Sequence, residues 1–184
     1  MSGGDDNAAP EETVWEGRFI AAKRRGKWEY VSRTRGVSAA VILAIDDGHV
    51  ILVEQYRAPL QKRCIELPAG LVGDETEGEE AEAAAIRELE EETGYRAEHM
   101  VDLGRYFASP GMSSEGFALL RAEGLTRIGE GGGVAGEDIL VHRVRLDRVV
   151  EFVAAKRGEG AAIDAKLLLL LAPLMLEPAG TPRD

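Results

Sequence analysis

The sequence predicts a single α+β domain in which strands and helices are layered around one core. Apolar segments of β type separated by turn residues come first, a stretch of helix-forming residues follows, and two further helical segments close the chain. The length of 184 residues suits one domain, and a hydrophobic fraction of 45% suffices for a sizeable core. We expect the domain to span residues 13–177, between disordered tails at 1–12 and 178–184.

The first predicted elements are antiparallel strands. Residues 13–35 form an N-terminal β segment, where aromatic and aliphatic residues flank the basic turn Arg24-Arg25-Gly26-Lys27 and so predict a hairpin. Residues 37–45 and 49–56 are apolar runs of β type joined by Asp46-Asp47-Gly48, which predicts a second hairpin.

The next predicted element is a helix of about four turns. Residues 79–93 are rich in Ala, Glu, Leu and Arg, contain no Gly or Pro, and are followed by Gly94, a residue that commonly ends helices. The glycine-rich loop at 129–138 (GEGGGVAGED) is expected to be mobile. Further extended segments are predicted at 95–108, 117–122 and 139–146, and further helices at 147–156 and 163–176.

Charge and composition disfavour several classes of protein. The 22 Lys and Arg residues face 33 Asp and Glu residues, and the net charge of −11 would repel nucleic acid and anionic membranes. The longest apolar run, 167–176, contains Pro173 and is about half the length that spans a bilayer. With a single cysteine, Cys64, and no leader-like N-terminus, we expect a cytoplasmic protein that binds neither nucleic acid nor membrane.

The predicted helix carries the densest chemical signal. Glu88 and Glu92 lie one turn apart on one face, with Glu91 beside them. Stacked like charges repel unless a cation lies between them, and Mg²⁺ or Mn²⁺ prefers such oxygen ligands. Arg87 is placed to hold one of these carboxylates. From these residues alone, a solvated acidic face with an ordinary surface ion pair is the alternative.

The spacing of these residues resembles a known family. Gly73, Glu79 and the run Arg87-Glu88-Leu89-x-Glu91-Glu92-x-Gly94-Tyr95 match the Nudix box, G-x5-E-x7-R-E-U-x-E-E-x-G-U, where U is aliphatic or aromatic. The order of predicted elements from about residue 14 to 176 is also similar to a Nudix domain. The resemblance implies an α/β/α sandwich on a mixed β-sheet with an N-terminal antiparallel β-hairpin. It also implies a metal-dependent hydrolase of nucleoside diphosphates linked to another moiety.

Two further motifs narrow the resemblance. Residues 66–70 (ELPAG), before the box, and Ser109-Pro110-Gly111, after it, are similar to ADP-ribose pyrophosphatases, which form AMP and ribose 5-phosphate. The run at 131–139 is instead similar to GDP-mannose pyrophosphatases. We expect ADP-ribose as substrate, with GDP-mannose or another nucleoside diphosphate sugar as the alternative. A sensor that binds such a ligand without hydrolysing it is an alternative of another class.

One departure concerns the box glycine. In relatives of this subgroup the glycine of Pro-Ala-Gly is itself the box glycine, whereas here Gly70 precedes Gly73, which has the strict spacing. Three residues are therefore expected to be inserted in the loop 71–78. Which of the two glycines has the structural role stays open, and so does the position of Glu79.

The resemblance implies roles for individual residues around the metal. Glu88 and Glu92 are the principal expected ligands of Mg²⁺ or Mn²⁺, and Glu91 and the Ala69 carbonyl complete the set. Arg87 and Glu91 are also assigned to the catalytic group. Glu137, which ends the glycine-rich loop, is the expected general base, with Glu130 or a metal-activated water as alternatives.

The resemblance also implies residues that contact the substrate. Arg57 is expected to bind the diphosphate, for which a guanidinium is well shaped. Glu66 and Glu115 are expected to hold a ribose hydroxyl or an outer water, and Trp28, or Trp15, to stack on the base. Ser109 and Gly111 belong to the same expected site. Similar proteins are homodimers that exchange N-terminal strands, so we expect a homodimer.

Overall fold

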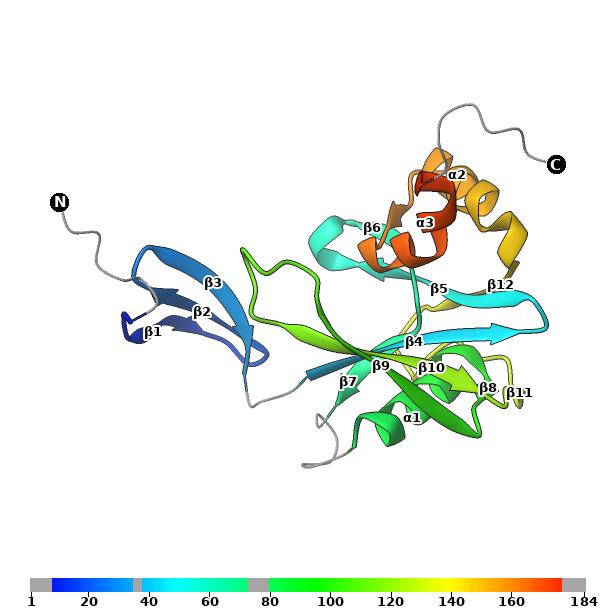
Figure 1. The fold of residues 1–184 in the computed structure, drawn as a ribbon, viewed down its shortest axis with the longest axis horizontal. Helices are drawn as coiled ribbons and strands as arrows, with labels where there is room; N and C mark the ends of the chain where they lie inside the picture. Colours follow the sequence, from blue (N-terminus) through cyan, green and yellow to red (C-terminus); the bar gives the residue numbers. More distant parts are fainter. Residues whose placement is uncertain (1–7, 35–37, 73–79, 177–184) are drawn as a thin grey trace.

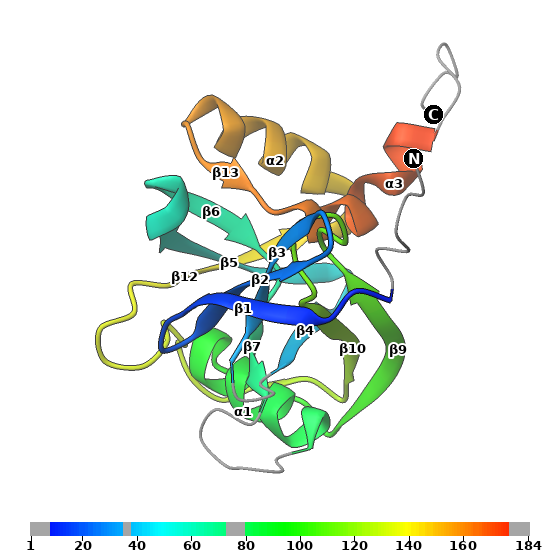
Figure 2. The ribbon, with the colours of Figure 1, turned by 90° about the vertical axis from the view of Figure 1, so that its left-hand side faces the viewer.

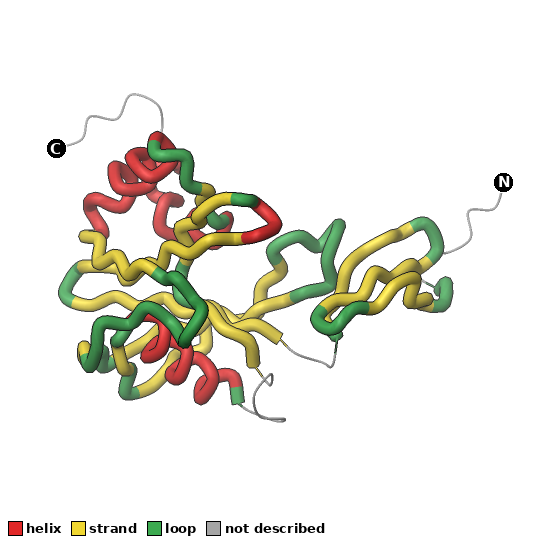
Figure 3. Tube along the Cα trace, turned by 180° about the vertical axis from the view of Figure 1, so that it is seen from behind, coloured by secondary structure: helices red, strands yellow, loops and turns green. Residues whose placement is uncertain are grey.

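The structure, a computed structural model, describes residues 8–34, 38–72 and 80–176. An eight-stranded mixed sheet lies between one helix on one face and two helices on the other, and a small three-stranded sheet stands to the side (Figures 1 and 3). The helices are α1 (Ala81–Thr93), α2 (Val149–Gly158) and α3 (Leu168–Leu176). Short 3-10 turns are η1 (Ala58–Leu60), η2 (Leu146–Arg148) and η3 (Ala165–Leu167).

The small sheet contains the predicted N-terminal hairpin and one more strand. Its strands are β1 (Glu11–Glu16), β2 (Ile20–Arg25) and β3 (Trp28–Arg33), all antiparallel. The turn between β2 and β3 contains Gly26 at φ 57°, a conformation that suits glycine. β3 joins the body of the protein through backbone hydrogen bonds, from Val31 N to Met112 O (2.9 Å) and from Ser114 N to Val31 O (3.0 Å).

The main sheet has the order β13-β6-β5-β4-β10-β9, with β12 paired to β5 and β7 paired to β4. β4 is parallel to β10 and β6 is parallel to β13, while the other pairs are antiparallel. A separate ladder joins β8 (Tyr95–Arg96) to β11 (Thr126–Arg127). The main strands are β4 (Ser38–Asp46), β5 (His49–Arg57), β6 (Lys62–Glu66), β7 (Ala69–Val72), β9 (His99–Phe107), β10 (Gly116–Glu123), β12 (Leu140–Arg145) and β13 (Ala162–Ile163).

β4 and β5 diverge soon after the turn that joins them. Asp47 at φ 44° and Gly48 at φ 68° make the predicted tight turn, and only two residue pairs connect the strands beyond it. Further along, Ile42 N–H donates to the Pro68 carbonyl at 2.8 Å. The chain crosses from β6, on the β5 side, to β7, on the β4 side, at Leu67 and Pro68. This crossing places Ala69 beside the point where the sheet opens.

The core has two halves, one on each face of the sheet. Ala40, Ile42 and Ala44 of β4 pack toward Ala85 and Leu89 of α1. Val41 and Leu43, which alternate with them, pack in the second cluster with Val149, Val153, Leu167 and Leu171 of the C-terminal segments. This alternation on a strand buried on both faces produces the α/β/α sandwich that the resemblance implies, and the view in Figure 2 shows the three layers.

The helices follow the sequence with one exception. α1 ends before Gly94, which has φ 72° and donates its N–H to Glu90 O, as predicted. The predicted helix at 163–176 begins only at Leu168, because residues 162–163 pair with β6 and Asp164 accepts a hydrogen bond from Lys166 N (2.6 Å). Over the described ranges, the helices are all too short or too polar to cross a membrane.

Candidate active site

Helix α1 turns one carboxylate inward, toward the sheet. Its buried face consists of Ala84, Ala85, Leu89, Glu92 and Thr93, which pack on β7 and β4. The Glu92 residue is only 6% exposed, and its Oε2 accepts a hydrogen bond from Ala69 N–H at 3.1 Å. A carboxyl group is thus buried beside the start of β7.

Burial, together with the charges of Glu88 and Glu137, raises the pKa of Glu92 to about 8. The Ala69 N–H and the more distant Arg57 act in the opposite direction and lower this pKa. In the described part of the chain, no arginine or lysine is hydrogen-bonded to the Glu92 carboxylate. The site therefore gathers acidic side chains, and the charged form of Glu92 is costly there without a further cation.

Glu88 and Glu91 line the same helix and share one arginine. Arg87 Nη1 donates to Glu88 Oε1 at 3.1 Å and to Glu91 Oε2 at 3.3 Å. Arg87 therefore contacts two box carboxylates, and its role in hydrolysis stays a prediction. The Glu88 side chain lies directly against Gly70, because a Cβ atom at position 70 would stand 2.0 Å from Glu88 Cδ.

This close contact bears on which glycine has the structural role. Gly70 pairs with Ala40 inside the sheet and leaves the space that the Glu88 carboxylate occupies. Gly73 and Glu79 both lie outside the described residues. The contact supports Gly70 as the glycine against which the carboxylate helix packs.

The donor atoms at this place are of the chemical kind that a hard divalent cation binds. Glu88, Glu91 and Glu92 supply carboxylate oxygens. Ala69, whose N–H is bonded to Glu92, is also the residue whose carbonyl the resemblance predicts as a ligand. Within residues 8–34, 38–72 and 80–176, no three Asp, Glu, His or Cys side chains are already close enough together to enclose an ion. A cation would relieve the repulsion that helps to raise the Glu92 pKa.

A pocket of about 320 Å³ adjoins these carboxylates through Ala69 and Gly70. Arg57 and Glu66 form a forked ion pair on its wall, with Nε to Oε1 at 2.6 Å and Nη2 to Oε2 at 2.8 Å. A second pair joins Arg33 Nε to Glu115 Oε1 at 2.6 Å. The lining consists of Arg33, Ala39, Val41, Arg57, Glu66, Ala69, Gly70, Leu71, Ala108, Glu115, Phe117 and Lys166.

The pocket contains three of the predicted substrate residues, namely Arg57, Glu66 and Glu115. Arg33 and Lys166 were not predicted, although they add two cationic groups to the wall. They come from β3 and η3, at opposite ends of the chain. Nothing in the sequence marks these two residues as pocket residues, because only the packing of distant segments brings them to the site.

The other predicted substrate residues lie apart from the described lining of this pocket. Ser109 and Gly111 belong to a turn in which Ser109 O accepts hydrogen bonds from Met112 N (3.0 Å) and Ser113 N (2.8 Å). Trp28 is 51% exposed on the small sheet, and Trp15, also on that sheet, is 57% exposed. The two tryptophans are therefore surface groups in a single chain, not core residues.

The glycine-rich loop is bonded to the end of α1. Gly132 N–H donates to Glu92 O at 2.9 Å and Gly133 N–H donates to Glu91 O at 3.0 Å. Gly131, Gly132 and Gly133 have φ values of 69°, 112° and 81°, which glycine adopts readily. The loop thus satisfies helix carbonyls that would otherwise lack partners.

This attachment brings Glu137 toward the carboxylate helix. Glu137 Oε2 accepts a hydrogen bond from Val134 N at 3.1 Å, and its charge contributes to the raised pKa of Glu92. Glu130 instead pairs with Arg127 at 3.0 Å, and its side chain is 92% exposed. Of the two loop glutamates, Glu137 is the one whose charge raises the pKa of Glu92.

Comparison with known proteins agrees with this architecture. Residues 34–159 match the family described as NUDIX domain. The chain is 34% identical to the methanol dehydrogenase activator of Bacillus methanolicus, over 77% of this chain and 74% of that protein. It is 33% identical to the ADP-ribose pyrophosphatase of Bacillus subtilis, again over 77% of this chain and 74% of the other.

A solved structure, titled as the crystal structure of an ADP compounds hydrolase, has the same fold. It aligns with a TM-score of 0.66 at 22% identity and covers 90% of this chain and 91% of that one. The predicted sandwich and the predicted family are both confirmed. The box carboxylates, the sandwich and the match over residues 34–159 place this chain in the Nudix family of hydrolases.

Proposed function

We propose that this protein hydrolyses the diphosphate bond of a nucleoside diphosphate sugar, with ADP-ribose giving AMP and ribose 5-phosphate. The observation that carries the proposal is the buried, uncompensated Glu92 beside a pocket whose wall holds Arg57. The name of the Bacillus subtilis relative supports ADP-ribose as the substrate. Nudix hydrolases generally depend on a divalent metal, and the carboxylates here match that requirement.

In this proposal Glu88, Glu91, Glu92 and the Ala69 carbonyl hold Mg²⁺ or Mn²⁺. The bound ion would neutralise phosphoryl oxygens and help to orient the attacking water. Arg87 keeps Glu88 and Glu91 in place through its two hydrogen bonds. Because Glu92 is buried, an ion that displaced its proton would interact with the carboxylate without competition from bulk water.

Glu137 acts as the general base in this scheme. It takes a proton from the attacking water, whose oxygen forms a new P–O bond while the bridging P–O bond breaks and its electrons stay with the leaving phosphate. The electrostatic coupling between Glu137 and Glu92 supports this role, since a base must lie near the metal carboxylates. The exposed pair with Arg127 makes Glu130 the weaker candidate.

Arg57 binds a diphosphate oxygen once substrate loosens its fork to Glu66. Glu66 and Glu115 then accept hydrogen bonds from ribose hydroxyls at the same pocket wall. Trp28, Ser109 and Gly111 remain part of the proposal, with Trp28 stacking on the base from a homodimer partner, because one chain alone leaves it half exposed. We propose that the protein is a cytoplasmic homodimer that binds neither nucleic acid nor membrane.

A substrate panel tests the proposal. Purified protein is incubated with Mg²⁺ or Mn²⁺ and ADP-ribose, ADP-glucose, GDP-mannose, NADH, coenzyme A or dATP, and the products are separated by chromatography. AMP and ribose 5-phosphate from ADP-ribose are expected. GMP and mannose 1-phosphate from GDP-mannose alone would move the assignment to the alternative substrate.

A non-hydrolysing sensor is the alternative of another class. It would bind ADP-ribose in calorimetry and yield no product with any member of the panel. The presence of Glu88, Glu91 and Glu92 together favours hydrolysis over this alternative. A catalytically silent protein with intact ADP-ribose binding would overturn the proposed function.

A further inference from the structure

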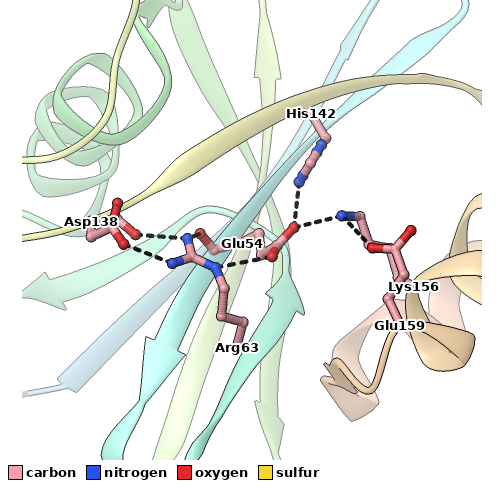
Figure 4. Close-up of polar contacts among 6 residues, drawn as sticks. All are labelled: Glu54, Arg63, Asp138, His142, Lys156 and Glu159. Carbon is pink, nitrogen blue, oxygen red and sulfur yellow. Dashed lines mark hydrogen bonds and ion pairs between the residues drawn. The ribbon is translucent and has the colours of Figure 1, made fainter.

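A second buried carboxylate, Glu54, lies on β5 and organises a cluster of charges (Figure 4). Glu54 Oε2 lies 2.8 Å from His142 Nε2 and 3.0 Å from Lys156 Nζ, and Glu54 Oε1 accepts a hydrogen bond from Arg63 Nε at 2.9 Å. These cationic or polar groups come from β12, α2 and β6. Glu54 therefore links β5 to the neighbouring strand β6 and to β12 and α2, which lie far from it in the sequence.

Arg63 extends this cluster to the glycine-rich loop. Its Nη2 donates to Glu54 O and to Asp138 O, both at 2.9 Å, and its Nη1 donates to Asp138 Oδ2 at 2.8 Å. One guanidinium thus makes four hydrogen bonds, two to β5 and two to the last residue of the loop. Because the Asp138 side chain is 82% exposed, the bond to its main-chain carbonyl matters as much as the ion pair.

The loop is consequently held at both ends. Its first half is bonded to the end of α1 through Gly132 and Gly133, and its last residue, Asp138, is bonded to Arg63. Glu137 lies between these anchors and immediately precedes Asp138. The backbone on either side of Glu137 is therefore held, by the bonds to α1 before it and by Arg63, through Asp138, after it.

We propose that Arg63 is a positioning residue for hydrolysis, which fixes the C-terminal end of the glycine-rich loop so that Glu137 stays over the carboxylate helix. The inference rests on the proposed function, in which Glu137 is the general base. Arg63 does not line the described pocket, and it acts on the reaction only through Asp138 and Glu137. A misplaced base raises the barrier to water attack without weakening the contacts that bind substrate.

The cluster itself provides a way to separate positioning from folding. His142 and Lys156 remain beside Glu54 when Arg63 is changed, so this buried carboxylate keeps two partners. Arg63→Lys also retains a positive charge near Glu54 but loses the fork that reaches the loop. This variant should fold normally, whereas Arg63→Gln removes both the charge and the fork.

The test compares both Arg63 variants with wild type on ADP-ribose, or on whichever panel member the wild type hydrolyses. We expect kcat to fall about tenfold in each variant with KM within about twofold, and backbone amides of residues 131–138 to exchange hydrogen faster. In a Glu137→Gln background, Arg63→Lys should lower kcat by less than twofold, because the base that it positions is gone. Arg143→Gln is the matched control, since Arg143 makes a surface pair with Asp46 and is expected to leave kcat and exchange unchanged.

The outcomes distinguish this inference from the proposed function. A wild type that hydrolyses no panel member overturns the proposed function, and with it the role of Arg63. If the wild type is active, an unchanged kcat in Arg63→Lys overturns only the positioning role. An equal loss of kcat with and without Glu137 also overturns it, because Arg63 would then act independently of the base.

Discussion

Two buried glutamates of similar exposure have opposite electrostatic surroundings. Glu54 is 5% exposed and Glu92 is 6% exposed. Burial by itself raises the pKa of Glu54, but hydrogen bonds from Lys156 and His142 outweigh that effect and lower this pKa. Burial, with a contribution from the neighbouring Glu88 and Glu137, raises the pKa of Glu92 to about 8.

The contrast separates a carboxylate that supports the fold from one that we propose binds an external cation. Three side chains already partner Glu54, so its charge joins strands and a helix. Glu92 receives a backbone N–H and, apart from the more distant Arg57, faces like charges, an arrangement that costs stability and is typical of functional sites. The burial of a glutamate alone therefore does not distinguish these roles, whereas its partners do.

The largest expected effect is on activity at Glu92. Glu92→Gln keeps the shape of the side chain but removes the charge that would bind the ion, so we expect kcat to fall about a thousandfold. The control is Glu90→Gln on the same helix, where Glu90 forms a surface pair with Arg96. Steady-state hydrolysis with Mg²⁺ measures both, and near-normal turnover by Glu92→Gln would remove the contrast between the two glutamates.

The next effect tests whether the proposed metal ligands need a residue without a side chain at position 70. In Gly70→Ala the new methyl group would collide with the Glu88 carboxylate, which must then move away. We expect about a hundredfold loss of kcat and weaker activation by Mn²⁺ in a metal titration. Gly158→Ala, at a position where an added Cβ meets nothing within 4 Å, is the control. Full activity of Gly70→Ala would mean that Glu88 is not held where the structure places it.

A smaller effect is expected on stability at the Glu54 cluster. Glu54→Gln leaves Arg63, His142 and Lys156 together without their shared anion, and we expect a loss of about 2–3 kcal/mol in the free energy of unfolding at pH 7. We expect less than the largest losses known for broken buried ion pairs, because these three side chains keep some contact with solvent. Urea denaturation measures the loss, and Glu151→Gln, on the surface, should change stability by less than about 0.5 kcal/mol.

The smallest expected effect is a gain in stability, instead of a loss, when Glu92 is replaced. In metal-free protein the raised pKa means that stability is complete below about pH 4.5 and declines as the pH rises through about 8, because the unfolded chain ionises first. Glu92→Gln should therefore match wild type at pH 4.5 and exceed it by about 2 kcal/mol at pH 8.5 in EDTA. Thermal melts at both pH values measure this gain. A wild type more stable than the variant at pH 8.5 would show that Glu92 is compensated after all.

The parts of the fold that depend on neighbouring residues were predictable from the sequence. The Asp46-Asp47-Gly48 turn and the end of α1 at Gly94 are determined locally, by residues that tolerate positive φ. Glu88 and Glu92 were also predictable as a pair, since helical spacing alone puts them one turn apart. The start of α3 was not, because pairing of residues 162–163 with β6 overrides helical propensity.

The parts of the site that depend on long-range register were not predictable. Arg33 reaches the pocket because β3 bonds to the segment around Ser113, and Lys166 reaches it from the far end of the chain. The Glu54 cluster likewise joins β5, β6, β12 and α2. Glu54 does leave one trace in the sequence, as a charged residue ending the apolar run 50–53, but its three partners are not visible there.

The attachment of the small N-terminal sheet has a practical consequence for protein engineering. Its last strand places Arg33 in the wall of the pocket and is hydrogen-bonded to Met112 and Ser114. A chain trimmed to begin at residue 38 would therefore lose one side of this pocket, and Glu115 would lose its ion pair with Arg33. A shortened version prepared for inhibitor screening would therefore select compounds against a cavity that the intact enzyme does not possess.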